Sequence, residues 1–452
     1  MREVLGVLGV LGVFVAGAAA SDRPPLVDAA KSGDRAALRA LIQKGANVNA
    51  SEADGTTALH WASYQDDVDS ADQLIRAGAN VNASNDLGAT PIWTASQNGS
   101  TAMVRRLLQA GANPNLALLL GETPVMVASR AGKADVVELL IGKGADVNAR
   151  AARGQTALMW AVAQEHPDVV KVLLAHGADV QARTEVWSQV MAVSPHGLLE
   201  YNRAIPHGGD TPLMFAARVG DRTSAALLVA AGARPNDADA WGVSATALAA
   251  HAGFGDLVAF LLDNGADANG ATAGFSALHA AIMRRDEKMV AALLTHGADA
   301  NAPLRTWTPT RRSSKDFNFE PPLVGASPFW LAARFGGPAV MRQLMKHGAD
   351  PLFVHHADYW AGEVAEHRTQ VTTALMAAVG MGGGISWVQP DRSAREALML
   401  EAVTLVVDSG LDVNAANTDG RTALDAAKAL KFESVVSFLI EKGAKAGGEI
   451  KN

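Results

Sequence analysis

The chain has 452 residues, of which 49% are hydrophobic and 19% charged, and its formal net charge is −7. This balance is typical of a folded protein and excludes a largely disordered one. The acidic excess argues against nucleic acid as the main ligand, and the absence of cysteine excludes disulfides, thiolate catalysis and cysteine-bound zinc.

The N-terminal segment has the pattern of a secretory signal peptide. An apolar run from Val4 to Val15 precedes three small residues, Ala18 to Ala20, which satisfy the small-x-small cleavage rule. We therefore assign residues 1–20 to a signal peptide and expect no membrane anchor after its removal, because no later stretch is long and apolar enough. An exported chain without cysteine indicates a bacterial periplasm or secretion.

A Gly-Ala pair then recurs along the chain at a fixed distance of 33 residues (78−45, for example). The first five glycines of the series are Gly45, Gly78, Gly111, Gly144 and Gly177. Twelve residues after each of the first four comes a Thr-Pro or Thr-Ala pair and an apolar residue: Thr57-Ala58-Leu59, Thr90-Pro91-Ile92, Thr123-Pro124-Val125 and Thr156-Ala157-Leu158. A period of this length indicates a stack of identical structural units.

Each unit reads as two helices. Thr90 can cap a helix with its hydroxyl, and Pro91 suits the first helical position, where a missing N–H costs nothing. Asn98-Gly99 ends that helix, a second apolar run follows, and Gly111 accepts the left-handed backbone just past its last turn. Since one such pair cannot bury its apolar face alone, the pairs must stack into a solenoid.

The period, the Thr-Pro segment and the glycine ends resemble the ankyrin repeat family. Gly232, Gly265, Gly297, Gly348, Gly410 and Gly443 continue the series. The resemblance implies an all-α ankyrin solenoid of about eleven helix-turn-helix units with loop insertions, and it implies that the protein is not an enzyme and has no cofactor.

The spacing between marks grows to 55, 51 and 62 residues in the C-terminal half (232−177, 348−297 and 410−348). The expected domains are therefore N-terminal repeats at 21–182, an insertion at 183–210, repeats at 211–302, an insertion at 303–326, and C-terminal repeats at 327–449 with insertions near 352–370 and 381–393. Loops inserted into a solenoid fall on one surface and are often functional, so we expect them to form a wall over the binding groove.

Each insertion carries one tryptophan: Trp187, Trp307, Trp360 and Trp387. Exposed tryptophans are typical of interface hot spots, so these four are candidate protein-binding residues together with Arg311 and Arg312. The alternative is that each ring pins its own loop to the solenoid. Trp61, Trp93, Trp160 and Trp330 lie at repeat-core positions instead, and packing is favoured there.

In the ankyrin family the finger tips and the exposed face of the first helix carry recognition. The tips here hold Leu87, Leu119, Leu120, Trp241 and Phe275, and the helix face holds Tyr64, Arg130, Arg218, Arg334 and Phe335. A mixed aromatic, aliphatic and arginine surface suits a protein partner.

Other polar clusters carry weaker signals. His355, His356, Asp358, Glu363, Glu366 and His367 could supply metal ligands, but they lack a metal-binding spacing, so we assign no metal site. Gly380 to Gly384 lacks the Lys-Ser or Lys-Thr of a phosphate loop and predicts a flexible break between helices. His60 and His279 occupy the repeat position after Thr-x-Leu or its equivalent.

The expected function is non-catalytic binding of an exported or envelope protein by a monomer, through the concave face and the long fingers. The alternative is small-molecule or glycan binding, or metal-dependent activity, built on the inserted loops. An aromatic pocket or a bound ion in the loops would favour that alternative.

Cleavage of the leader provides the first test. Protein recovered from its own host should begin at or near Ser21, because the small residues Ala18 to Ala20 fit the cleavage site. N-terminal sequencing of the envelope fraction measures this directly. An intact Met1 on protein from the cytosolic fraction would contradict export.

Overall fold

The computed structural model describes residues 23–192, 202–308, 319–361, 366–388 and 391–450. The chain divides into two compact units, unit 1 ending at Ala151 and unit 2 beginning at Ala152. Three sequence predictions lie outside the described residues: the signal peptide at 1–20 and the binding residues Arg311 and Arg312.

The capping residues build each helix pair as the sequence predicts. The Thr90 hydroxyl accepts from the Trp93 N–H at 3.3 Å, with Pro91 in the first turn of the helix. Gly99 ends this helix with φ 78°, and Ser100 then caps the second one by accepting from the Met103 N–H. Because both helices start and end at fixed residues, the next pair repeats the same geometry.

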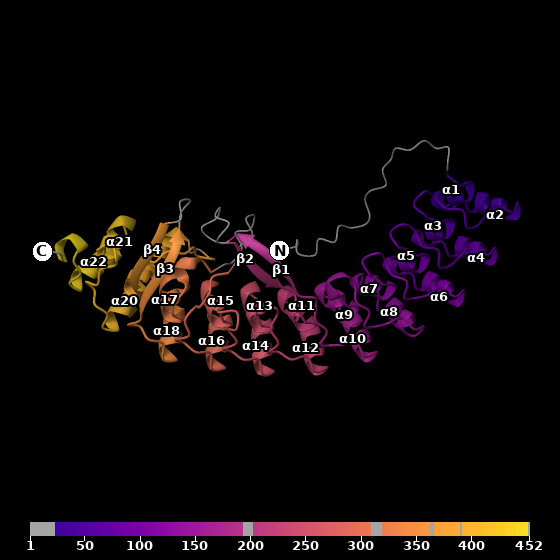
Figure 1. The fold of residues 1–452 in the computed structure, drawn as a ribbon. Helices are drawn as coiled ribbons and strands as arrows, with labels where there is room; N and C mark the ends of the chain where they lie inside the picture. Colours follow the sequence, from indigo (N-terminus) through magenta and orange to yellow (C-terminus); the bar gives the residue numbers. More distant parts are fainter. Residues whose placement is uncertain (1–22, 193–201, 309–318, 362–365, 389–390, 451–452) are drawn as a thin grey trace. The chain divides into compact units, whose positions relative to one another are not determined.

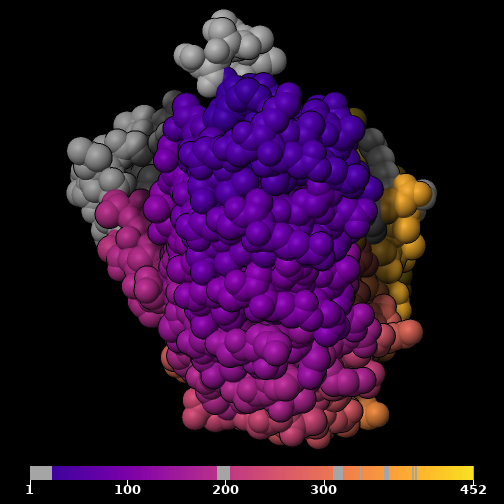
Figure 2. All heavy atoms as spheres, turned by 90° about the vertical axis from the view of Figure 1, so that its right-hand side faces the viewer, coloured from indigo at the N-terminus to yellow at the C-terminus, as the bar shows by residue number. Residues whose placement is uncertain are grey.

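Unit 1 consists of four such pairs. Its helices are α1 (Pro25–Ser32), α2 (Arg35–Gln43), α3 (Ala58–Tyr64), α4 (Val68–Arg76), α5 (Pro91–Asn98), α6 (Thr101–Gln109), α7 (Pro124–Arg130) and α8 (Ala134–Ile141). First helices pack on first helices and second on second, and the small residues Ala62, Ala95 and Ala128 are buried where they meet. Figure 2 shows this unit as a continuous surface coloured from indigo to purple in sequence order.

Unit 2 continues the pairing from α9 (Ala157–Ala163) and α10 (Pro167–Ala175), after a short turn of helix at Ala152–Gly154. Its next helices are α11 (Pro212–Val219), α12 (Arg222–Ala230), α13 (Ala245–Ala252), α14 (Gly255–Asp263), α15 (Ala277–Met283) and α16 (Glu287–Thr295). In Figure 1, α12, α14 and α16 form one row and α11, α13 and α15 form the other.

The C-terminal part of unit 2 is less regular. It comprises η3 (Pro321–Leu323), α17 (Pro328–Leu331), the π-helical η4 (Ala332–Gly336), α18 (Pro338–Lys346), α19 (Ala374–Ala378), α20 (Arg392–Asp408), α21 (Ala423–Leu430), α22 (Glu433–Glu441) and α23 (Gly447–Ile450). Across the described part of the chain, no helix combines the length and the apolar character needed to cross a membrane.

The prediction of an all-α fold is wrong, because unit 2 contains two antiparallel β-hairpins. Strand β1 (Trp187–Ala192) pairs with β2 (Asn202–His207), and β3 (Val354–Ala361) pairs with β4 (Glu366–Thr373). Both lie on the side of the first helices in Figure 1. The neighbouring helices satisfy their own backbone groups, so the backbone of each added segment must pair with itself.

The crossing of the helices in unit 2 depends on small side chains. Ala161 in α9 is fully buried (0% exposed), so an aspartate there would place an unpaired charge between helices. We expect Ala161→Asp to lower the free energy of unfolding by about 3 kcal/mol or more, as measured by urea denaturation.

The matched control is Ala175→Asp, since Ala175 is an exposed alanine in the adjacent α10. This control should lose less than about 1 kcal/mol. Equal losses in the two variants would show that burial at the crossing is not what selects alanine.

Candidate protein-binding site

Three leucines stand exposed at the tips of successive fingers in unit 1. Leu87 is 48% exposed, Leu119 is 75% exposed and Leu120 is 65% exposed. The two fingers are joined directly, because the Leu119 N–H donates to the Leu87 carbonyl oxygen at 3.0 Å. The leucines are therefore held next to one another on a fixed backbone, and we call them the leucine ridge.

Two further candidates in unit 1 lie on first helices. Tyr64 is exposed at the end of α3 and meets the Trp61 ring edge-on, with ring centroids 5.9 Å apart. Arg130 at the end of α7 lies near the Glu122 carboxylate, with Nη1 3.5 Å from Oε1. Tyr64 thus presents an open aromatic surface, whereas the Arg130 charge is partly compensated within the chain.

Phe275 is not an exposed finger-tip residue, and this prediction needs correction. Its side chain is only 5% exposed, because Phe319 covers it with ring centroids 5.4 Å apart and Trp241 contacts it from the other finger. Phe319 itself is fully buried. The half-buried Trp241 remains at the surface, but Phe275 cannot contact a partner directly.

Trp387 extends this aromatic cluster across the first-helix row of unit 2. Its ring lies 5.2 Å from Phe319 and 5.4 Å from the His251 ring at the end of α13. Phe319 and Trp387 come from segments of the chain that are distant in sequence, so the two segments hold each other on the helices. Trp387 is half-buried and joins its own loop to the solenoid.

Gly380 to Gly384 do not form a free link between helices. Arg334 donates from Nε to the Gly383 carbonyl oxygen at 3.2 Å and from Nη2 to that of Gly384 at 3.3 Å. A Cβ at Gly384 would lie 2.7 Å from the Leu323 side chain, so only glycine permits this close approach. The sequence predicts a flexible break here, whereas the structure packs the loop against the helices.

The same contacts alter the expected roles of Arg334 and Phe335. Burial lowers the pKa of Arg334 to about 10, partly offset by the charge of Glu320, and its guanidinium is occupied by the loop carbonyls. Phe335 is buried, with the Arg334 guanidinium 4.6 Å from the centre of its ring. Neither side chain is offered to a partner on the first-helix face.

The β1–β2 hairpin holds its tryptophan by ring contacts. Trp187 stacks on its cross-strand partner His207 at 5.4 Å and 21°, and the Arg153 guanidinium lies 4.2 Å from its ring centroid. Trp187 and Trp307 are both half-buried. Trp187 therefore packs against its own unit and leaves only part of its ring at the surface.

Arg218 lies exposed on the first-helix face, as the resemblance implies, but it is paired. Its Nη2 lies 2.6 Å from the Asp210 carboxylate. Burial raises the pKa of the neighbouring Asp239, and the charge of Asp210 raises it further. The Arg218–Asp210 pair thus stabilises the base of the finger that carries Trp241.

The β3–β4 hairpin presents one face to solvent. His356, Asp358 and Trp360 alternate with the buried His355 and Ala357 along β3. Trp360 is 42% exposed and contacts its cross-strand partner His367, whose Nε2 lies 2.5 Å from the Asp358 carboxylate. Trp360 is the most open of the insertion tryptophans.

Strand alternation also divides the histidine cluster of this hairpin. His355 faces the helices and donates from Nε2 to the Pro322 carbonyl oxygen at 2.9 Å, while His356 and His367 face solvent. Glu363 lies outside the described residues. Within the described ranges, no three histidine, cysteine or carboxylate side chains are placed to hold a metal ion together.

His60 and His279 have the structural roles that the repeat predicts. His279 is buried at the start of α15, where Nδ1 lies 2.9 Å from the Ser276 hydroxyl and Nε2 donates to the Ala302 carbonyl oxygen at 3.0 Å. His60 makes the equivalent contacts with Thr57 and Ala89. Burial lowers the pKa of both, that of His279 to about 4.

Comparison with known proteins matches this architecture. The family described as ankyrin repeats (3 copies) matches residues 26–118, 92–184 and 213–303, which together make up more than half of the chain. The chain belongs to the ankyrin repeat family. Ankyrin repeats generally serve as protein–protein interaction scaffolds, and the fold is typically non-catalytic.

One solved structure that is similar to this chain is the human ASB11 ankyrin repeat domain. The two are 30% identical in sequence over 54% of this chain and 99% of that domain, with a TM-score of 0.45. A comparison with curated proteins gives no match.

The neutral His279 makes stability depend on pH. Its pKa is about 4 in the folded protein and near 6.5 when exposed, so its contribution is complete above pH 6.5 and is lost as the pH falls toward 4. We expect this residue alone to account for a loss of about 3 kcal/mol over that interval.

Urea unfolding at about pH 7.5 and about pH 4.5 measures this loss in the wild type and in His279→Gln, which keeps a polar side chain without titrating. The wild type should lose more stability than the variant. Parallel losses in the two proteins would mean that His279 is not the titrating group.

Proposed function

We propose that this protein is a non-catalytic scaffold that binds an exported or envelope protein. The proposal includes about eleven stacked units, with inserted segments between some of them, and a leader that directs the chain to a bacterial periplasm or out of the cell. The family supports protein binding in general. The leader pattern supports the location.

The observation that carries the proposal is the leucine ridge, Leu87, Leu119 and Leu120. Single exposed apolar residues are ordinary on protein surfaces, but these three are adjacent and lie on a backbone fixed by the bond between Leu119 and Leu87. Covering a leucine side chain gains about 1.5 to 3 kcal/mol of transfer free energy. A partner with a complementary apolar surface would gain most from contact at this point.

A fixed ridge also reduces the cost of binding. The Asn85 side chain accepts from the Leu87 and Ala89 N–H groups, at 3.1 Å and 2.9 Å, so the finger is already ordered. Little backbone entropy is then lost when a partner docks. Tyr64, on the adjoining helix pair, would extend the same surface with an aromatic side chain.

In unit 2 the proposed contacts lie on the outer surfaces of the inserted segments. Phe319, Trp387 and Arg334 fasten two of these segments over first helices, which leaves less of that face free. Trp360 on β3 and Trp241 at its finger are the aromatic side chains best placed to meet a partner. Trp187, Trp307 and Trp387 would contribute only with the exposed parts of their rings.

Removing the apolar character of the ridge tests the proposal. The double variant Leu87→Glu and Leu119→Glu should weaken capture of the partner from an envelope extract about five- to thirtyfold, which corresponds to roughly 1 to 2 kcal/mol. The amount of captured partner, quantified by mass spectrometry, is the measurement. Helix content should stay the same because both leucines are exposed.

Leu430→Glu is the matched control, since Leu430 is an exposed leucine at the end of α21. Capture by this variant should equal that of the wild type. Full capture by the double variant would mean that the ridge is not the recognition surface.

A further inference from the structure

The turn between α15 and α16 departs from the pattern of the other turns. At the residue that reverses the chain between two helices, Arg285 has φ 58°, in the left-handed region that disfavours any residue with a Cβ. The corresponding positions of other pairs hold glycine at Gly33, Gly99, Gly132, Gly220 and Gly253. Arginine at this position is strained, so something other than backbone preference must account for its presence.

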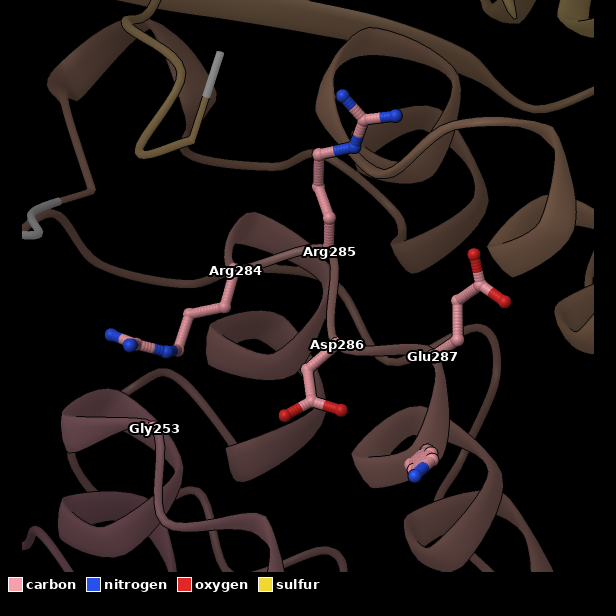
Figure 3. Close-up of a pocket in the computed structure, with 6 residues that line it drawn as sticks. Gly253, Arg284, Arg285, Asp286 and Glu287 are labelled. Atoms are coloured by element: carbon pink, nitrogen blue, oxygen red, sulfur yellow. The ribbon is translucent and has the colours of Figure 1, made fainter. Parts of the chain in front are cut away.

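Arg285 and the preceding Arg284 point in different directions (Figure 3). The Arg284 side chain lies over Gly253, in the preceding turn, and donates from Nη1 to the His251 carbonyl oxygen at 2.9 Å. The Arg285 guanidinium points away from Gly253 and lies 3.0 Å from where a Cβ on Gly337 would stand, in the following turn. The two arginines thus extend over three successive turns of unit 2.

The hydrogen-bond donors of Arg285 are unused. Among the described residues, its guanidinium makes no hydrogen bond, ion pair or ring contact, although the side chain is half-buried. Burial lowers the pKa of Arg285, and the nearby charge of Glu287 only partly offsets this. Other half-buried arginines are occupied, as Arg106 is by Asp72 and Arg334 by the Gly383 carbonyl oxygen.

A surface pocket of about 480 Å³ adjoins these side chains. It is lined by Gly253, Arg284, Arg285, Asp286, Glu287 and Lys288. One of its two carboxylates is already used, because Asp286 caps α16 by accepting from the Met289 N–H at 3.0 Å. Three cationic side chains therefore face one uncommitted carboxylate, in a protein whose net charge is −7.

We propose that Arg285 anchors an acidic side chain of the protein partner in this pocket, with Arg284 and Lys288 adding positive charge around it. A guanidinium with free donors can hold a carboxylate through two parallel hydrogen bonds, and partial burial strengthens them. Trp387 contacts His251, whose carbonyl oxygen Arg284 binds, so the acidic group would lie close to an aromatic surface. This inference rests on the proposed scaffold function.

Replacing Arg285 by glycine separates a binding role from a structural one. Glycine relieves the left-handed strain, so Arg285→Gly should unfold at the same or a higher urea concentration than the wild type. The same variant should bind a fluorescently labelled glutamate-rich peptide at least tenfold more weakly in a polarization titration at low salt. A loss of stability in this variant, or unchanged peptide binding, would overturn the proposal.

Lys431→Gly is the control for the strain alone. Lys431 has φ 57° in the turn between α21 and α22 and is exposed, so its replacement should raise stability without changing peptide affinity. Glu287→Gln removes the competing carboxylate and should tighten the peptide severalfold. Weaker binding by Glu287→Gln, or a loss of affinity in Lys431→Gly equal to that in Arg285→Gly, would contradict a specific site.

Two further arms identify the ligand and separate this proposal from the scaffold function. Inorganic phosphate should displace the peptide no better than chloride at equal ionic strength; strong displacement by phosphate would show an anion site of another kind. Partner capture that persists in Arg285→Gly would overturn the anchor and leave the scaffold standing. Arginine-dependent peptide binding without any partner capture would have the opposite meaning.

Discussion

The stacking of short helix pairs is the constraint on which this structure depends. Helices of seven to nine residues, such as α3 and α4, are too short to be stable alone in water, so their stability must come from packing against neighbouring pairs. Packing at this distance requires small residues such as Ala62 and Ala161 at the crossings. It also requires a sharp reversal between helices, which glycine provides most easily.

Inserted segments must leave that stack undisturbed. In unit 2 the segments with β1–β2 and β3–β4 pair their own backbones and contact the helices only through side chains, as His355 does through Pro322 and Trp330. Phe319 and Trp387 likewise close over first helices. The additions therefore occupy surface that a simple solenoid would leave open, and recognition moves to the finger tips and to the outer sides of the additions.

The parts of the fold that follow from local chemistry could be predicted from the sequence. The period located the helix pairs, and residues such as Thr90, Pro91 and Gly111 marked their ends, because a cap acts within one turn of the chain. The core positions of Trp93 and Trp160 followed from the same register. The exposed leucines at the finger tips followed from the repeat frame as well.

Features that depend on distant contacts could not be predicted in this way. Phe275 occupies a tip position, but Phe319 buries it from 44 residues away (319−275). Gly380 to Gly384 resembled a flexible link because the close approach of Leu323 and the hydrogen bonds from Arg334 are not visible in a local pattern. The hairpins were missed because a helical period says nothing about segments that lie outside it.

Strain by itself does not single out a functional residue in this chain. Asp66, Glu165 and Lys431 also occupy left-handed turn positions, but they are exposed, and their charged groups remain in water. Arg285 combines the same strained backbone with a half-buried guanidinium whose donors are unused within the described residues. A residue that conflicts with local backbone preference and also forgoes solvation is maintained at a cost to stability, and the most direct compensation is a bond to a group outside the chain.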